Sequence, residues 1–284
     1  MTLQVERHAS PEEFLERAES FLAPREAEHN LMFGLLSRLR RNPLAYGTAP
    51  YFATISTAGG VVAAAMRTPP YNLILSEVDD ERACDAIAAD AFDVYGSIRG
   101  VLGPVAPAAR FVRTWEALTG AQGRFARGQR TYRAERAERP VGVPGSMRAY
   151  TEADRTLVLE WLEAFFDEAM GDEAVQTAEG TLKGKLEDPD GALVLWQDRE
   201  PVSFAGYGGP TPNGIRIGPV YTPPELRRRG YATALTAELT AALLRDRRFC
   251  FLFTDLANPT SNSIYQKIGY EPVTDVDEWV FDQP

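Results

Sequence analysis

The stretch that most constrains this chain runs from Ile215 to Ala242. It opens with a strand-like segment, residues 215–222, in which β-branched and aromatic residues are interrupted by Gly218-Pro219. Because proline has no N–H to donate to a strand ladder, a bulge or a splayed strand pair is expected at this point. Any fold for this chain must therefore accommodate a strand that is broken halfway along.

An arginine-rich turn and a helix follow the interrupted strand. Arg227-Arg228-Arg229-Gly230-Tyr231-Ala232 precedes a segment whose leucines recur at every fourth position from Leu235. The first amides of a helix have no partner within it, and the helix dipole is positive there. Since Gly230 and Ala232 leave the backbone open to approach, the turn is suited to binding a phosphate or pyrophosphate.

This pattern resembles the acetyl-CoA pyrophosphate motif of the GNAT superfamily of N-acyltransferases, Gln/Arg-x-x-Gly-x-Gly/Ala. A second block, Cys250 to Tyr270, is similar to the strand and helix that follow the motif in that superfamily, where Asn…Asn/Ser-x-(aliphatic)-Tyr-x-x-x-Gly-(Phe/Tyr) recurs. The resemblance covers roughly the last 140 residues. It implies a mixed α/β structure, the GNAT fold, with a splayed central strand pair in the C-terminal domain.

Length and composition are those of an ordinary soluble protein with more than one domain. The chain has 284 residues, of which 44% are hydrophobic and 25% charged. It has no apolar run long enough to cross a bilayer and no basic, apolar leader, so we expect a cytoplasmic protein without a membrane partner. Cys84 and Cys250 fit that compartment; Cys250 is expected to be a buried thiol, and a disulfide is the less favoured alternative.

The charge is unevenly distributed along the chain. Residues 1–143 contain 17 arginines and 17 acidic residues, whereas residues 144–284 contain 13 basic and 23 acidic residues, which accounts for the net charge of −10. Such a surface argues against nucleic acid as a partner, because phosphate neutralisation requires a basic face. It would attract a cationic amine, although an acidic surface that only promotes solubility is the simpler interpretation.

The first half of the chain is predicted to share the element order of the second. Helices near residues 11–22 and 26–41 precede strand-like runs at 51–56, 61–67 and 73–76, and another helix follows near 80–92. Residues 101–107 and the helix after them parallel residues 217–223 and their helix. No glycine stands where a pyrophosphate would approach, so this half is expected not to bind acyl-CoA. A helix and strand cap of unrelated origin is the alternative.

The predicted organisation is a tandem GNAT arrangement. Residues 1–122 form a degenerate GNAT-like N-terminal domain, 123–144 a crossover strand and linker, and 145–284 the catalytic N-acetyltransferase domain. In the latter, two helices near 152–168 and 174–186 would line the acceptor side, and 192–197 and 202–208 would form a hairpin. A monomer or a homodimer is expected.

The resemblance also implies which residues hold acetyl-CoA, the expected co-substrate. The pantetheine arm would pair as an added strand with Val220, Tyr221 and Thr222. The pyrophosphate would bind at the turn, formed by Arg227, Arg228, Arg229, Gly230, Tyr231, Ala232 and Thr233. Further contacts to the arm are implied for Asn258, Asn262 and Ser263. No metal site is expected, because His8 and His29 have no other ligand at matching spacing.

Catalytic groups are less completely specified. Tyr265 matches the superfamily tyrosine that lies close to the thioester sulfur, where a phenol can protonate the leaving thiolate; a packing tyrosine is the alternative. A glutamate on the motif strand often serves as general base in this superfamily, but that strand offers only Arg216. Glu163, Asp167 and Asp255 could act through water, or the amine could arrive already neutral.

These observations favour an acyl-CoA-dependent N-acyltransferase that moves an acetyl group to a primary amine of a small molecule or a protein. A non-catalytic acyl-CoA-binding regulatory protein is the alternative. A P-loop nucleotide enzyme is disfavoured, because the Lys-Ser/Thr pair that a P-loop needs is missing from Arg227 to Ala232.

Overall fold

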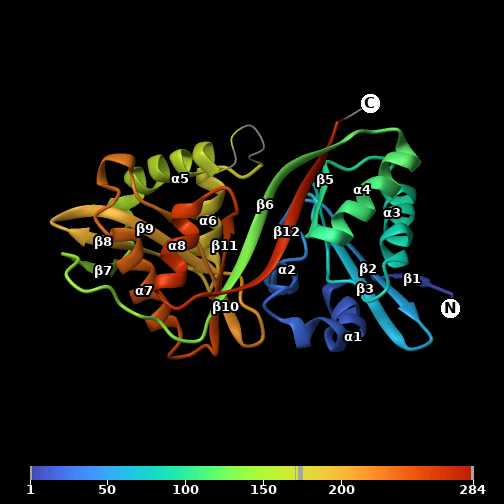
Figure 1. The fold of residues 1–284 in the computed structure, drawn as a ribbon, viewed down its shortest axis with the longest axis horizontal. Helices are drawn as coiled ribbons and strands as arrows, with labels where there is room; N and C mark the ends of the chain where they lie inside the picture. Colours follow the sequence, from blue (N-terminus) through green and yellow to red (C-terminus); the bar gives the residue numbers. More distant parts are fainter. Residues whose placement is uncertain (1, 170, 172–174, 283–284) are drawn as a thin grey trace. The chain divides into compact units, whose positions relative to one another are not determined.

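The computed structural model describes residues 2–169, 171 and 175–282 (Figure 1). It divides into two compact units: unit 1 comprises Met1–Thr131 and Val273–Pro284, and unit 2 comprises Tyr132–Pro272. The boundaries differ from the sequence-based expectation at residues 122 and 145, because they fall inside two strands, and the last twelve residues belong with the first half of the chain.

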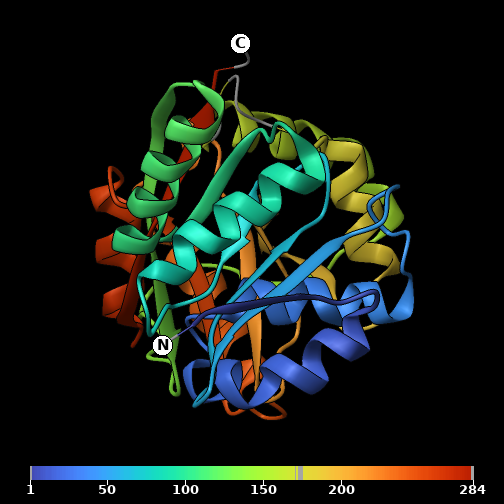
Figure 2. The same cartoon turned by 90° about the vertical axis from the view of Figure 1, so that its right-hand side faces the viewer.

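Unit 1 is a mixed sheet with two helices on each face. Its elements are β1 (Gln4–Arg7), α1 (Pro11–Leu22), α2 (Asn30–Arg41), β2 (Tyr51–Thr57), β3 (Gly60–Arg67), β4 (Leu73–Leu75), α3 (Arg82–Tyr95), β5 (Gly100–Pro104), α4 (Val105–Thr119), most of β6 (Gly123–Ala134) and most of β12 (Glu271–Phe281). The strand order is β1-β2-β3-β4-β5-β12-β6, with β4 and β5 parallel. Figure 2 shows α1 and α2 in blue and α3 and α4 in green on this unit.

Alternation along the strands of unit 1 explains its two layers of core. Ala53 and Ile55 pack in a cluster with residues of α3 and α4, whereas Phe52 packs with residues of α1 and α2. The predicted start of α1 is confirmed: Ser10 Oγ accepts a hydrogen bond from the Glu13 N–H at 3.2 Å, and Glu13 Oε2 accepts one from the Ala9 N–H at 2.9 Å.

Unit 2 has the same plan. Its elements are β7 (Ser146–Ala149), a 3-10 turn (Glu152–Asp154), α5 (Arg155–Ala169), α6 (Ala178–Glu187), β8 (Ala192–Asp198), β9 (Glu200–Gly208), β10 (Gly214–Tyr221), α7 (Tyr231–Leu243), β11 (Phe249–Asp255) and α8 (Pro259–Lys267). The order from the end of β6 is β6-β11-β10-β9-β8-β7, with β10 and β11 parallel. The helix expected at 174–186 begins at Ala178; residue 174 lies outside the described residues.

The two faces of the unit 2 sheet carry different helices. Phe204 packs in a cluster with residues of α5 and α6, while its neighbour Ala205 packs in a cluster with residues of α7. On β10, Ile215 and Ile217 belong to the α7 cluster. Since side chains alternate along a strand, Arg216 between them projects toward the face that carries α5 and α6.

Strand pairing corrects the predicted match between the halves. In each unit two helices precede antiparallel strands, and the last of these pairs in parallel with the next strand after a helix: β4 with β5, and β10 with β11. The counterpart of β10 is therefore β4, and that of α7 is α3. The match of residues 101–107 with 217–223 was wrong, because a shared Gly-Pro is a local feature whereas sheet position depends on pairing.

The structure also bears on the expected state of the cysteines and on the search for membrane-spanning helices. Both cysteines are buried and free, so the prediction of a buried Cys250 thiol is confirmed. Among the described residues, no helix is long and apolar enough to cross a membrane.

Candidate functional site

The central feature of unit 2 is the parting of β10 from β11. Their parallel ladder covers only three pairs, from Gly214 with Phe249 to Arg216 with Phe251, although β10 continues to Tyr221 and β11 to Asp255. Beyond residue 216, β10 stays paired with β9, with a register shift between Ile217 and Val220. The bulge predicted at Gly218-Pro219 is thus present, and the two strands are splayed after it.

The space beside the bulge is open. Among the described residues no side chain or remote backbone atom lies within 4 Å of the position that a Cβ on Gly218 would take. Because a parallel partner would supply hydrogen bonds along this edge, the β11-facing edge of β10 has groups available to another extended chain.

The turn after β10 delivers the start of α7. Arg228 and Gly230 have φ angles of 65° and 83°, which bend the backbone sharply into the helix. The first helical hydrogen bond of α7 runs from the Ala234 N–H to the Gly230 carbonyl at 2.9 Å, so the helix supplies no acceptor for the amides of residues 230–233. A Cβ on Gly230 would lie 3.0 Å from Val143 Cγ2. This turn accepts glycine far better than any other residue.

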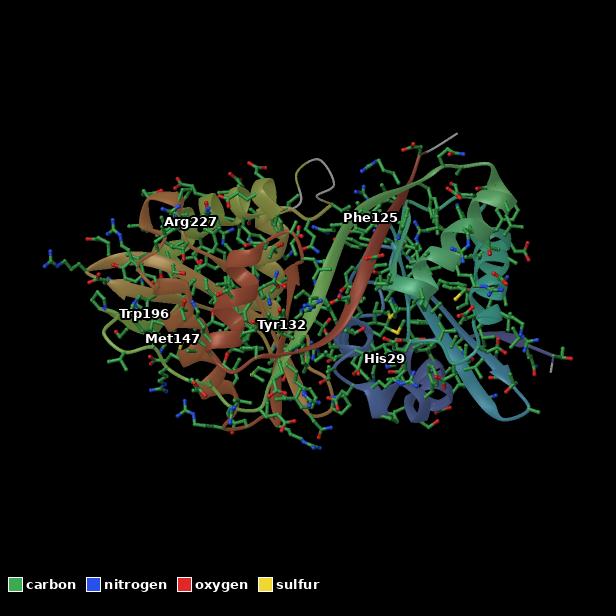
Figure 3. All side chains as sticks on the ribbon, viewed as in Figure 1. His29, Phe125, Tyr132, Met147, Trp196 and Arg227 are labelled. Atoms are coloured by element: carbon green, nitrogen blue, oxygen red, sulfur yellow. The ribbon has the colours of Figure 1, made fainter. Side chains whose placement is uncertain are left out.

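The three arginines of the turn have different surroundings. The Arg227 guanidinium forms an ion pair with Glu168 of α5 at 2.7 Å, donates from Nε to the Thr222 carbonyl at 2.8 Å and lies over the Tyr221 ring (Figure 3). Arg228 and Arg229 are exposed. Arg227 is therefore held toward α5, while the other two can contribute charge near the start of α7.

The segment expected to pair with pantetheine is partly engaged. Val220 and Tyr221 pair with β9, and the Tyr221 carbonyl accepts a hydrogen bond from Ser203 Oγ at 2.8 Å. Thr222 Oγ1 donates to the same Ser203 hydroxyl at 2.9 Å. These contacts fix the backbone of the segment, and they leave the β11-facing edge at Val220 as its most accessible part.

Two side chains of the predicted site mainly stabilise the local fold. Tyr231 donates its hydroxyl proton to Asp198 Oδ2 at 2.7 Å, so only its amide belongs at the turn. Asn262 accepts from Thr254 Oγ1 and donates from Nδ2 to the Asp255 and Asn258 carbonyls, at 3.2 and 2.9 Å. Asn262 thereby joins the end of β11 to the start of α8.

The remaining predicted residues lie in the first turn of α7 and at or within α8. Ala232 and Thr233 are in the first turn of α7, Asn258 immediately precedes α8, and Ser263 is exposed on α8. Tyr265 packs its ring against the edge of the Tyr270 ring, with centroids 6.0 Å apart. Within the described residues its hydroxyl has no hydrogen-bond partner. Burial raises the pKa of Tyr265 to about 12, so the phenol keeps its proton at neutral pH.

The three carboxylates considered as general bases are either exposed to solvent or used in a local turn. Glu163 and Asp167 are exposed on α5, and Asp255 accepts a hydrogen bond from the Ala257 N–H at 2.7 Å, which closes a turn. Among the described residues, no three His, Cys, Asp or Glu side chains gather in a way that could hold a metal.

One titratable group near the bulge was missed by the sequence analysis. Lys185 of α6 has a pKa lowered to about 7, chiefly by burial and secondarily by the charge of Arg216. The available signal was compositional: only three of the 30 basic residues are lysines, at positions 183, 185 and 267.

Similarity to known proteins is clearest at the level of the fold. Residues 210–280 match the family described as "FR47-like protein". Over the whole chain, the structure is similar to a tandem GNAT protein from the clavulanic acid biosynthesis pathway, with a TM-score of 0.60, 13% identity and coverage of 100% of this chain and 99% of that one.

Two further solved structures show the same likeness. A GCN5-related N-acetyltransferase from Sphaerobacter thermophilus has a TM-score of 0.61 and 16% identity, covering 99% of this chain and 96% of its own. A GNAT-family acetyltransferase from Colwellia psychrerythraea has a TM-score of 0.54 and 12% identity, covering 98% and 100%. A search of curated proteins finds no significant match.

Proposed function

We propose that unit 2 is an acyl-CoA-dependent N-acyltransferase, since this chain has the GNAT fold in tandem. Acetyl-CoA is the donor, and a primary amine of a small molecule or a protein is the acceptor. Unit 1 does not bind acyl-CoA.

The observation that carries this proposal is the splayed strand pair followed by an exposed helix start. The β10–β11 ladder ends at Arg216, the space beside Gly218 is open, and α7 begins 13 residues later with free amides. An extended pantetheine arm fits an unpaired strand edge, and a pyrophosphate fits a helix N-terminus. Both ends of one cofactor-sized ligand thus have a matching partner.

The chain's own groups have separate tasks in this reaction. The thioester of acetyl-CoA supplies an activated acyl carbon. The backbone at Val220 orients the arm, and the amides of residues 230–233, with Arg228 and Arg229 beside them, bind the diphosphate. The Tyr265 phenol, protonated at neutral pH, donates its proton to the departing thiolate sulfur.

The acceptor is a primary amine that approaches from the side of α5 and α6. The acidic surplus of residues 144–284 favours a cationic acceptor, because a negative field raises its local concentration. The carboxylates of α5 that could contribute, Glu163 and Asp167, are exposed and therefore free to interact with such a ligand.

Isothermal titration with acetyl-CoA, run beside a thiol-release assay over a panel of amines, tests the proposal. We expect one donor molecule bound per chain and thiol release that depends on an amine. Binding without release would instead support the non-catalytic regulatory protein, and absence of binding would reject both functions.

A further inference from the structure

Lys185 lies on the α6-carrying face of the sheet, beside the bulge of β10. The glycines at positions 206 and 208 of β9 lie on the same face as Phe204, which packs with α5 and α6. The position that a Cβ on Gly206 would take is 3.3 Å from Lys185 Cε and 3.1 Å from the Gly218 carbonyl oxygen. Lys185 Cε thus lies near the bulge of β10, and Nζ lies against Gly208 of β9, whose partner on β10 is Arg216, the last residue of the β10–β11 ladder.

Glycine is what makes room for this lysine. The position of a Cβ on Gly208 would lie 3.5 Å from Lys185 Nζ, and the corresponding position on Gly206 is in tight contact with Lys185 Cε. A side chain at position 206 would press on Lys185 Cε, whereas one at position 208 would make an ordinary van der Waals contact with Nζ. The Lys185 side chain therefore lies against one face of β9, next to Gly206 and Gly208.

Two charged groups act on the Lys185 amine. Arg216, on the neighbouring strand and the same face, disfavours its protonation, and Asp188, just after α6, favours it. The position that a Cβ on Gly208 would take lies 3.5 Å from Asp188 Oδ2 and also 3.5 Å from Lys185 Nζ. Within the described residues, however, the lysine is in no ion pair. Burial, with a smaller contribution from the positive charge of Arg216 and against the opposing charge of Asp188, lowers the pKa of Lys185 to about 7.

The residue type matters at this position. The chain uses 27 arginines and three lysines, so arginine is its usual cation. Arginine cannot lose its proton in a protein, whereas a buried lysine can. A lysine placed where an arginine would remain charged provides a group that can accept a proton near neutral pH.

We propose that Lys185 is the general base of the acyl transfer. It would take the place of the carboxylate that the motif strand, β10, does not have. This inference rests on the function proposed above. The neutral Nζ takes a proton from the acceptor's amine nitrogen as that nitrogen bonds to the acyl carbon. The carbon–sulfur bond breaks, the electron pair leaves on sulfur, and the proton of Tyr265 neutralises the thiolate. The protons on Lys185 and Tyr265 are then rebalanced through solvent.

The titration of Lys185 can be measured without knowing the acceptor. Protein carrying ¹³C-labelled lysine should give three side-chain Cε signals, assigned by Lys183→Arg, Lys185→Arg and Lys267→Arg. We expect the Lys185 signal to titrate near pH 7, and Arg216→Gln to raise the Lys185 midpoint. A Lys185 midpoint above about pH 9 would overturn the proposal.

The catalytic role of Lys185 is tested with simple acceptors whose attack on the thioester is accelerated by a general base. Thiol release from saturating acetyl-CoA is followed with water alone, with tyramine and with spermidine as acceptors. Lys185→Gln and Lys185→Arg should each lower kcat by about 100-fold or more and remove the rise of the rate through pH 7. The matched control is Lys183→Gln, an exposed lysine on the same helix, which should change neither.

The outcomes separate the two proposals. Unchanged acetyl-CoA affinity in both Lys185 variants, with lost turnover, supports the general base. Variants that keep wild-type turnover and pH dependence overturn the base and leave the proposed function standing. An activity that Lys185→Arg retains would show that only a positive charge is needed, which also overturns the base. Wild-type protein that binds no acetyl-CoA, or releases no thiol with any probe, would reject the function and the base together.

Discussion

The starts of α3 in unit 1 and α7 in unit 2 occupy equivalent places in the same fold, yet their chemistry is opposite. Four acidic residues, Glu77, Asp79, Asp80 and Glu81, precede α3, whereas three arginines and a glycine precede α7. Asp80 Oδ1 accepts a hydrogen bond from the Arg82 N–H at 3.1 Å, so a carboxylate of the chain already uses an amide of α3. Hydrogen bonds from Arg82 lower the pKa of Asp80 to about 2, which keeps it charged.

The parallel strand pairs next to these helices differ too: β4 and β5 of unit 1 stay close together, whereas β10 and β11 of unit 2 part. In unit 1, a Cβ on Gly103 of β5 would lie 2.8 Å from the Leu75 Cβ of β4, so these two strands are in close contact. In unit 2, the space beside Gly218 is open. One fold can thus provide either a parted strand pair followed by a helix start without an internal anion or a closed strand pair followed by a helix start with one, and local side chains decide between them.

The largest expected effect is at the start of α7. Gly230→Glu should abolish acetyl-CoA binding, a loss of at least 100-fold by titration calorimetry, because it adds a negative side chain where the diphosphate approaches and strains a positive φ. The matched control is Gly120→Glu in unit 1, where φ is 75° and the space is open. Equal loss in both variants would contradict a single donor site in unit 2.

Tyr265→Phe should separate turnover from affinity. Without the phenolic proton the thiolate leaves unassisted, so we expect kcat to fall by about 10-fold to 100-fold while acetyl-CoA affinity stays within about two-fold. Steady-state thiol release and calorimetry measure the two quantities. Tyr95→Phe, which alters a half-buried tyrosine of unit 1, is the control and should change neither; unaltered kcat in Tyr265→Phe would remove Tyr265 from the mechanism.

Each unit contains a cation that folding largely removes from water, Arg67, which is buried in unit 1, and Lys185, which is partly exposed in unit 2. Replacing these two residues should have opposite effects on stability. Lys185→Met should stabilise the protein at pH 7 by about 2 kcal/mol, a discounted share of the cost of burying an ion. Arg67→Met should destabilise it, because Arg67 donates to the Tyr71 carbonyl at 2.9 Å and lies over the Tyr95 ring. Denaturant unfolding measures both; destabilisation by Lys185→Met would contradict the unpaired state of Lys185.

The pH dependence of the Lys185 effect has a definite sign. Its folded-state pKa is about 7 and its ordinary value is 10.5, so between these values the unfolded chain holds a proton that the folded chain lacks. Wild-type stability should therefore gain from this group as pH rises from about 7 to 10. The advantage of Lys185→Met should be greatest below pH 7 and shrink above it.

The smallest effect concerns the arginines of the turn. Arg228→Gln and Arg229→Gln should each weaken acetyl-CoA binding by about five-fold, with the difference fading in high salt. Arg227→Gln should weaken binding less, since its guanidinium is already paired with Glu168. If Arg227→Gln had the greatest effect, the ion pair would have to break when the donor binds.

Much of the fold was predictable because its signals are local. Ser10 and Glu13 mark a helix start by their spacing, and a hairpin turn joins β2 and β3 as expected, with Ala58 and Gly59 in the turn and Gly60 already paired with Thr57. Gly218-Pro219 predicted the bulge because proline cannot extend a ladder. Each of these outcomes depends on a few neighbouring residues.

Other features depend on partners far away in the sequence and were not predictable. The length of β6, twelve residues where about five were expected, depends on neighbouring strands of its sheet. The placement of β12 beside β5 joins residues more than 170 positions apart. The match between the halves was misplaced for the same reason, since two Gly-Pro pairs look alike until pairing shows that β4 is the counterpart of β10.

By itself the sequence determined that a glycine-containing turn would start a helix at residue 231 and that the strand before it would be irregular, because glycine and proline have distinctive backbone preferences. Only the tertiary structure decided that Asn262 serves the β11–α8 junction, that Arg227 is tied to Glu168, and that Lys185 lies beside the bulge. Burial and neighbouring charge are properties of the folded environment, so the pKa of a lysine is not encoded in the residues adjacent to it.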